Sequence, residues 1–263
     1  MNAPDAVGVV TKSILKTALA SLGLAPGDVV AFHTSLSAFG HIENGADTVI
    51  DAILETIGPS GTTLAPTLTF DERWGPECPP VFDVRRTPSV TGRTPEVFRL
   101  RPDAVRSLHP THSWAAIGPR ARELTTGHED SATPCGPESP LGRLARDPRG
   151  KILLAGVTLK SCTFFHHCEE VAGVPYHLQK RPTHVVMTDT TGAVIERDLY
   201  LHCWHGLALD FTKPEADLLR LGVMKKAFLI HAPLSLLNAS RTAEFIIDKL
   251  RRNEEYFKTQ ELC

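Results

Sequence analysis

Residues 28–68 read DVVAFHTSLSAFGHIENGADTVIDAILETIGPSGTTLAPTL, and the apolar patterns in this stretch indicate the fold class. The segment 28–34 is a short apolar run rich in β-branched residues, which predicts a buried strand. Residues 47–57 carry apolar side chains at helical spacing, and residues 62–68 predict a second strand. The apolar stripe of this helix consists of Val49, Ile50, Ile53, Leu54 and Ile57. Alternating helices and strands favour an α/β fold, here a single domain with a central mixed β-sheet flanked by helices.

Similar patterns continue on both sides of this stretch. Two alternating runs within residues 184–201, separated by Thr191 and Gly192, predict a β-hairpin and therefore antiparallel strands. The Pro-rich residues 76–90 predict a functional loop rather than a linker. We expect residues 1–263 to form one domain, with the loop near 71–90 and the hairpin as smaller additions. The remaining expected elements are helices at 11–22, 95–101, 119–125, 161–171, 214–221 and 241–256, and strands at 113–118, 151–157 and 227–231.

Composition excludes several classes of protein. The 263 residues carry 28 Lys+Arg against 30 Asp+Glu, so the formal charge of −2 excludes a basic protein built to coat nucleic acid. No apolar run approaches the ~20 residues of a membrane span, so we expect no membrane partner. The start MNAPDAVGVVTKS lacks the basic and apolar regions of a signal peptide, which predicts a cytoplasmic protein. None of the 6 cysteines forms a CxxC pair, and we expect free thiols.

The richest stretch for chemistry is residues 156–173, GVTLKSCTFFHHCEEVAG, which follows a predicted strand. Thr163, His166 and Glu169 are three residues apart, so on a helix they lie along one side. They offer a hydroxyl, a base near neutral pH and a carboxylate that can orient the imidazole. Thr163, His167 and Glu170 form a rival set, and a solvated helical face is a third reading. Periodicity alone does not choose among them.

Two further stretches present polar groups after predicted strands or around a turn. Residues 106–114, RSLHPTHSW, hold a cation, two imidazoles and three hydroxyls, which suits a loop that binds a phosphate or a carbonyl. The alternative is a turn whose side chains bond their own backbone. Residues 33–40, HTSLSAFG, can hold an anion at a strand-to-helix turn. The chain has no Walker lysine and no GxGxxG, which argues against nucleotide hydrolysis and hydride transfer.

Ordered motifs span residues 10–180. They are His33-Thr34-Ser35-Leu36, Gly45-Ala46-Asp47-Thr48-Val49, Gly58-Pro59-Ser60-Gly61-Thr62-Thr63-Leu64, the run from Arg106 to Ser113, Ser139-Pro140-Leu141-Gly142-Arg143-Leu144, the run from Thr163 to Glu169, and Val174-Pro175-Tyr176. Together they resemble the aminoglycoside 3-N-acetyltransferases, an antibiotic N-acetyltransferase family whose fold differs from that of the small GNAT acetyltransferases.

The resemblance implies an enzyme that uses acetyl-CoA as co-substrate and needs no metal. The resemblance selects the first set of residues on the predicted helix, with His166 as catalytic base, Glu169 as its partner and Thr163 beside the thioester. The residues that it implies for the CoA channel are Ser35, Leu36, Ser37, Arg106, His109, Thr111, His112, Ser113, Ser161 and Cys162.

The acceptor is expected to be a small amine, an aminoglycoside or a relative. Antibiotic-modifying members carry an acid three residues before the threonine, whereas this chain has Lys160. Residues 199–211 hold histidines where those members hold acids, and an added cation weakens binding of a polycation. Acids of the long loop can restore part of an acidic pocket. The expected acceptor-binding residues are Asp71, Glu72, Asp83, His202 and His205.

The predicted chemistry is direct acetyl transfer in a ternary complex, with His166 taking the proton of the attacking amine. Cys162 or Cys168 as an acyl-accepting nucleophile is an alternative within the same reaction. A metal-dependent hydrolase that uses the His and Cys clusters is a second function, and a non-catalytic module that binds CoA or an amine is a third. The sequence leaves open whether the chain is a monomer or a homodimer.

Overall fold

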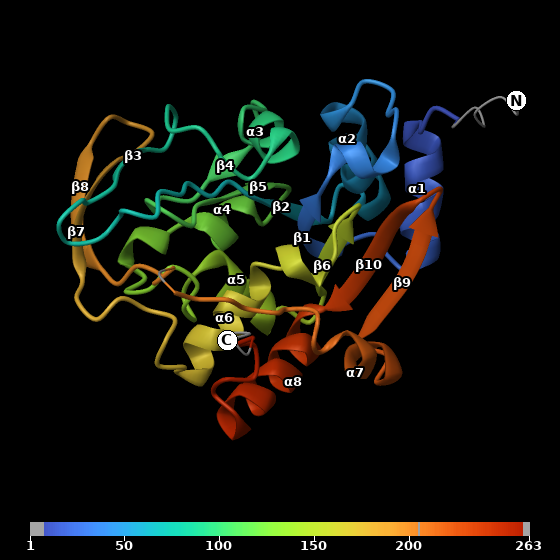
Figure 1. Cartoon of the computed structure of the whole chain (residues 1–263). Helices are drawn as coiled ribbons and strands as arrows, with labels where there is room; N and C mark the ends of the chain where they lie inside the picture. Colours follow the sequence, from blue (N-terminus) through green and yellow to red (C-terminus); the bar gives the residue numbers. More distant parts are fainter. Residues whose placement is uncertain (1–7, 205, 260–263) are drawn as a thin grey trace, which may run out of the picture.

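A seven-stranded mixed sheet runs through the centre of the computed structural model, which describes residues 8–204 and 206–259 (Figure 1). Its strand order is β4-β5-β2-β1-β6-β10-β9. The central strand β1 pairs in parallel with β2 and β6, whereas the outer strands are antiparallel to their neighbours. The bounds are β1 (Val29–Thr34), β2 (Thr62–Pro66), β4 (Val105–Arg106), β5 (Trp114–Ile117), β6 (Gly150–Ala155), β9 (Met224–Leu229) and β10 (Ala232–Asn238).

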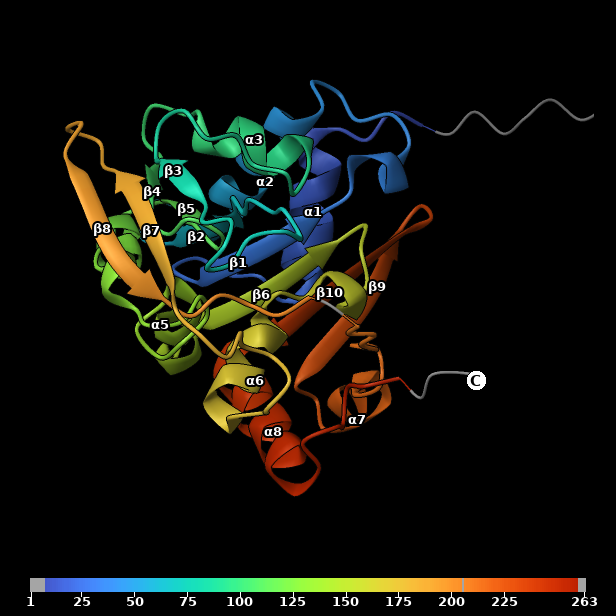
Figure 2. The same cartoon turned by 60° about the vertical axis from the view of Figure 1, so that its left-hand side comes forward.

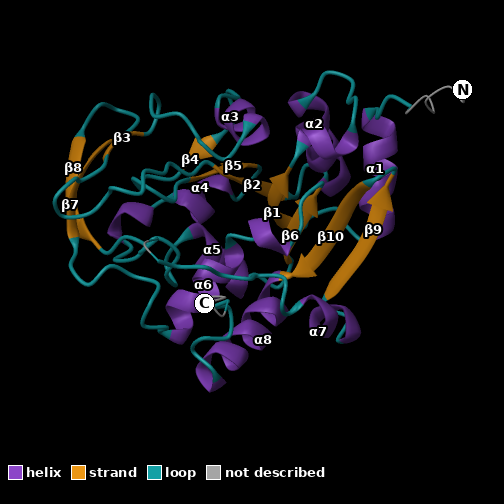
Figure 3. Cartoon of the chain, in the orientation of Figure 1, coloured by secondary structure: helices purple, strands orange, loops and turns teal. Residues whose placement is uncertain are grey.

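Helices cover both faces of this sheet (Figure 3). One face packs against α1 (Lys12–Leu22), α2 (Ala46–Ile57) and α3 (Arg93–Arg99). The other packs against α4 (Ala121–Thr125), α5 (Pro140–Arg146), α6 (Phe164–Ala172), α7 (Glu215–Arg220) and α8 (Ala239–Arg252). Successive residues of β1 point to opposite faces, so Phe32 joins the first core and Ala31 the second. The predicted α/β class, with a mixed sheet between helices, is confirmed.

A smaller sheet lies beside the main one (Figure 2). It contains β3 (Val81–Asp83), β7 (Thr183–Thr188) and β8 (Val194–Leu199). The strands β7 and β8 are the predicted hairpin, and β3 comes from the Pro-rich segment and pairs in parallel with β7. The two expected additions therefore form one sheet, with Phe82, Val185 and Met187 fully buried in its core.

Several expected boundaries were wrong. The sequence predicted one strand at 227–231, but β9 and β10 form a hairpin that turns at Ile230, whose φ is 57°. The helix expected at 161–171 begins at Phe164, because residues 159–161 form the 3₁₀ turn η3 (Leu159–Ser161). The last helix ends at Arg252 rather than Tyr256. The strands β3 and β4 and the helix α5 were not expected at all.

Two turns that lead to the site pack directly against each other. Gly156 follows β6 and has a φ of 76°. A Cβ at this position would lie 2.7 Å from the carbonyl oxygen of Ser35 and 2.9 Å from the Cβ of Ala38. The turn after β1, which leads into η1 (Leu36–Phe39), can approach the end of β6 because residue 156 has no side chain.

Within residues 8–204 and 206–259, none of the helices has both the length and the apolar character that crossing a membrane requires.

Candidate active site

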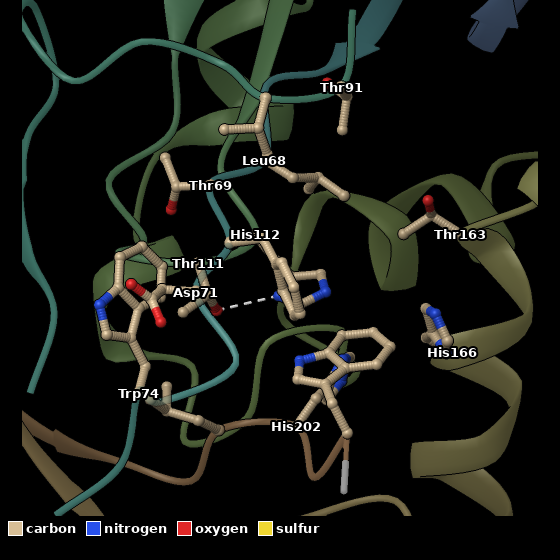
Figure 4. A pocket seen from close by; sticks show the side chains of 14 residues that line it. Leu68, Thr69, Asp71, Trp74, Thr91, Thr111, His112, Thr163, His166 and His202 are labelled. Carbon is tan, nitrogen blue, oxygen red and sulfur yellow. Dashed lines mark hydrogen bonds between the residues drawn. The ribbon is translucent and has the colours of Figure 1, made fainter. Parts of the chain in front are cut away.

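A cavity of about 240 Å³ opens between the end of β2, the start of α6 and the segment that follows β8 (Figure 4). Its wall is largely apolar and aromatic, with imidazoles at one side. The lining residues are Leu68, Thr69, Phe70, Asp71, Trp74, Val90, Thr91, Thr111, His112, Thr163, His166, Leu201, His202 and Trp204.

His166 and Glu169 form a buried pair on α6, at the wall of this cavity. The Nδ1 atom of His166 lies 2.8 Å from Oε2 of Glu169, and the two residues are 7% and 0% exposed. With Nδ1–H donating to the carboxylate, the ring keeps Nε2 as its basic nitrogen. Thr163, at the N-terminal end of the same helix, also lines the cavity. The structure thus brings together the three residues of the first set.

Two neighbours that the sequence reasoning missed hold the Glu169 carboxylate in place. The hydroxyl of Tyr176 donates to Oε1 over 2.9 Å, and Nδ1 of His177 lies 3.3 Å from Oε2. Burial and the nearby carboxylate raise the pKa of Tyr176, so its hydroxyl stays a donor. Tyr176 belongs to the Val-Pro-Tyr motif, and this motif was the one signal that could have identified it.

His167 and Glu170, from the rival set, do not pair with each other. His167 points away from the cavity, and its Nδ1 donates to the carbonyl oxygen of Cys135 over 2.7 Å. Glu170 instead contacts His202, with 2.7 Å between Oε1 and Nε2. Burial raises the pKa of Glu170 to about 8. Because neighbouring residues on a helix point about 100° apart, the adjacent histidines face different surroundings.

A cluster of neutral imidazoles lies beside the His166–Glu169 pair. The Nε2 atoms of His177 and His202 are 2.9 Å apart, and the rings of His112 and His202 have centroids 4.3 Å apart. Burial, reinforced by the neighbouring histidines, holds the pKa of all three well below the usual range. The indole of Trp204 stacks on His112 at an interplanar angle of 8°. His166 therefore has uncharged rings around it.

Arg106, which was predicted to contact CoA, binds oxygen atoms of the protein itself. Its guanidinium donates to the carbonyl oxygens of Thr67, Val84 and Thr87 and to the hydroxyls of Thr67 and Ser113. These bonds join the end of β2 to the segment after β3. Protein oxygens thus accept from all three guanidinium nitrogens, which favours a structural role for Arg106, and its expected phosphate contact stays a prediction.

The other residues expected along the CoA channel divide into accessible and buried groups. Thr111 and His112 line the cavity, and Ser161 and Ser37 are exposed. Ser35 and Leu36 are partly buried at the turn after β1, where the hydroxyls of Ser35 and Ser37 are 3.0 Å apart. Three residues are too deeply buried to contact a ligand without rearrangement, with exposures of 0% for His109, Ser113 and Cys162.

Cys162 and Cys168, the two thiols nearest the candidate base in sequence, are poor nucleophiles. Burial raises the pKa of Cys162 to about 12, and it raises the pKa of Cys168 well above the ordinary value. The thiolate is the reactive form of cysteine, so burial disfavours the alternative in which either thiol accepts the acetyl group.

The expected acceptor-binding residues also separate. Asp71 and His202 line the cavity, and Asp71 accepts a 2.8 Å hydrogen bond from Nε of Arg73. Glu72 is exposed and is not part of the lining. Asp83 accepts hydrogen bonds from the backbone N–H groups of Arg85 and Arg86, which fix the turn after β3. His205 lies outside the described residues.

Known proteins share this sequence and fold. The family model described as aminoglycoside 3-N-acetyltransferase matches residues 32–251. Aminoglycoside N(3)-acetyltransferase IX of Micromonospora chalcea is 39% identical over an alignment of 182 residues, which covers 64% of this chain and 64% of that protein. This chain thus matches less than two thirds of the length of that curated relative.

Solved structures match over nearly the whole chain. The crystal structure of aminoglycoside acetyltransferase AAC(3)-Xa has a TM-score of 0.81 and 32% identity, covering 95% of both chains. A binary complex of AAC-IIIb with CoASH has a TM-score of 0.78 and 30% identity, covering 97% of this chain and 100% of the other.

Proposed function

Because this chain belongs to the aminoglycoside 3-N-acetyltransferase family, we propose that it transfers an acetyl group from acetyl-CoA to a primary amine of an aminoglycoside or a related amine. The observation that carries the proposal is the buried His166–Glu169 pair at the wall of a cavity that Thr163 also lines. The names of the relatives and the CoASH complex of AAC-IIIb support the choice of both substrates.

His166 acts as the general base in the proposed reaction. The amine nitrogen attacks the carbonyl carbon of the thioester while its proton passes to Nε2 of His166. The carbon–nitrogen bond forms, the carbon–sulfur bond breaks, and the departing sulfur takes up the proton from the imidazolium. Glu169 faces Nδ1 and stabilises the charged ring during transfer. A positioned base of this kind contributes about 10²–10⁴ in rate.

Thr163 stabilises the negative charge that develops on the thioester oxygen. Its hydroxyl makes no hydrogen bond to another described residue, and Thr163 is 8% exposed. A free donor at the cavity wall is what an oxyanion requires, and one such donor is worth about 2.7–4 kcal/mol in other enzymes.

Acetyl-CoA approaches along the turn after β1 and the loop around Thr111 and His112. In this proposal the hydroxyls of Ser35, Ser37 and Ser161, which are exposed or partly buried, donate to acetyl-CoA. Thr111, His112 and Thr163 line the cavity and contact its thioester end. The acceptor amine enters beside Asp71, Trp74 and Trp204. One carboxylate and several aromatic rings then form the acceptor's part of the wall.

The test is a thiol-release assay with acetyl-CoA and a panel of aminoglycosides, aminosugars and amino-acid-like amines. At least one amine should release CoA and gain one acetyl group by mass spectrometry, and His166→Ala should lose this activity. The proposal fails if the folded protein binds CoA in calorimetry but no amine raises thiol release above that of His166→Ala.

A further inference from the structure

Three buried side chains from separate segments gather behind the cavity wall. One ring nitrogen each of His112 and His202 and the sulfur of Cys135 all lie within 4.8 Å of one another. The three residues are 4%, 2% and 0% exposed. His112 and His202 also line the cavity, so the cluster lies between the protein core and the candidate active site.

Each histidine has one ring nitrogen held by a neighbour. The Nδ1 atom of His112 lies 2.9 Å from the hydroxyl of Thr111, and Nε2 of His202 lies 2.7 Å from Oε1 of Glu170. The remaining nitrogen of His202, Nδ1, is buried and has no hydrogen-bond partner among residues 8–204 and 206–259. Histidines that bind a metal typically donate their other N–H to an oxygen in this way.

Glu170 contacts two of the three residues. The oxygen that faces His202 also accepts the backbone N–H of Cys135 over 2.8 Å. The carboxylate therefore fixes the ring of His202 and the backbone that carries the thiol. Orientation of the ligands by a shared buried carboxylate is an outer-shell feature of metal sites.

We propose that His112, Cys135 and His202 bind a zinc ion at the wall of the cavity. Two imidazoles and a thiolate are ligands that zinc prefers, and the thiolate neutralises one of its two charges. Bonds of about 2.0–2.3 Å place neighbouring ligand atoms of a tetrahedral site about 3.3–3.8 Å apart, so small side-chain shifts suffice. Three protein ligands leave the fourth position open to water on the cavity side.

A second set, His166, His177 and His202, also has nitrogens within 4.8 Å of one another. Its His166 is the base of the proposed reaction through its Nδ1 contact with Glu169, and a metal ion on Nε2 of that ring would remove the base. The set also lacks an anionic ligand. These contacts favour the set that contains Cys135, and the two sets predict different effects of the same substitutions.

The test uses the full chain after chelator treatment and dialysis, titrated with Zn²⁺ in calorimetry and with Co²⁺ in absorption spectroscopy. We expect one equivalent of metal, and a thiolate-to-Co²⁺ charge-transfer band. Cys135→Ser should weaken Zn²⁺ binding by about 100-fold or more and remove this band, since changes in the outer shell alone cost 10–100-fold. Cys203→Ser, which changes a partly buried thiol next to His202, should keep both.

His112→Asn provides an independent variant if Cys135→Ser does not fold, and it should weaken Zn²⁺ binding by a similar factor. The proposal is overturned if the parent protein binds no Zn²⁺ at concentrations of up to about 100 micromolar, which corresponds to a Kd above that value. It is also overturned if Cys135→Ser binds as the parent does while His177→Ala loses the metal.

Discussion

Two neighbouring histidines on α6 occupy opposite environments. His166 borders the cavity and pairs with Glu169, whereas His167 bonds to the backbone at Cys135. A helical pattern of polar residues gives both positions the same weight. Only their contacts in the folded chain distinguish them. A substitution of His166 can therefore be tested against the same substitution of His167 as a control.

We predict that His166→Ala lowers kcat by about 10² or more, because the reaction loses its base. The KM for acetyl-CoA should change little, since the imidazole acts mainly in the transition state. Steady-state thiol release with a responsive amine measures both parameters.

His167→Ala is the matched control, and it should keep kcat within a few-fold of the parent. Its cost should appear as lost stability, because the carbonyl oxygen of Cys135 loses a buried donor. The assignment of the base is wrong if His167→Ala is the inactive variant and His166→Ala retains most of its kcat.

At the scale of elements, Arg106 attaches the small sheet to the main one. We predict that Arg106→Ala lowers the free energy of unfolding by about 3 kcal/mol or more, because several buried carbonyl oxygens lose a charged donor together. Urea unfolding measures the loss. Arg252→Ala, which removes an exposed ion pair with Asp248, should cost less than about 1 kcal/mol.

The same variant separates a structural role of Arg106 from a role in cofactor binding. CoA affinity of the folded Arg106→Ala protein, measured by calorimetry, should stay within a few-fold of the parent. A tenfold loss of affinity with unchanged unfolding would instead restore the phosphate contact that the sequence predicted.

Gly156 joins the turn after β6 to the turn after β1. We expect Gly156→Ala to lower the free energy of unfolding by about 2–4 kcal/mol, because a left-handed backbone and a clash with the carbonyl of Ser35 add together. Gly192→Ala is the control, since its φ of 92° is also positive but a Cβ there meets nothing within 4 Å. It should cost about 1–2 kcal/mol in urea unfolding, and equal losses would contradict the account.

Local patterns predicted the elements whose signals are local. Apolar periodicity located the central strands and the longer helices, and Thr191-Gly192 marked the β7–β8 turn. The β9–β10 turn was missed because Ile230, not glycine or asparagine, adopts the positive φ. β3 was missed because it has three residues and forms only where β7 offers a partner.

The site was predictable only where its residues share one helix. The spacing of His166 and Glu169 can be read along the chain, and the family resemblance chose between the two sets. The contacts of Glu169 with His177 and of Glu170 with His202 join distant segments. No periodicity encodes such contacts, so the imidazole cluster emerged only from the fold.

At the scale of the whole molecule, the buried histidines predict sensitivity to acid in the metal-free protein. Seven of the histidines that the structure describes have a pKa below the usual range, chiefly through burial, and for His33 and His128 it is about 4. They are neutral in the folded chain and take up protons on unfolding below about pH 6.5, so their stabilising contribution is lost as the pH falls. Each contributes up to about 1.4 kcal/mol per pH unit.

Glu170 acts in the opposite direction. Its pKa of about 8 lies above that of an unfolded glutamate, so its contribution is present at low pH and is lost as the pH rises toward 8. The effect of Glu170 on the pH dependence of stability is about as large as that of one histidine and has the opposite sign. The seven histidines therefore decide the direction of the change. Between pH 7 and pH 5 the free energy of unfolding should therefore fall as the pH is lowered. Urea unfolding at pH 7, 6 and 5 measures this slope, and equal stabilities at these values would refute it.

The bonds of Arg106 to the segment after β3 also bear on how the proposed acceptor specificity could be changed. In that segment the guanidinium donates to the backbone carbonyl oxygens of Val84 and Thr87 rather than to side chains. Every amino acid has such a carbonyl oxygen. Residues of the segment can therefore be exchanged without loosening its attachment to the scaffold. Phe70, Asp71 and Trp74 line the cavity from the loop between Thr67 and Val84, and Arg106 binds the carbonyl oxygens at both ends of this loop. Val90 lines the cavity from the segment after β3, so all four side chains can be changed while these backbone contacts remain. Libraries aimed at a different acceptor should vary these positions and leave Arg106 untouched.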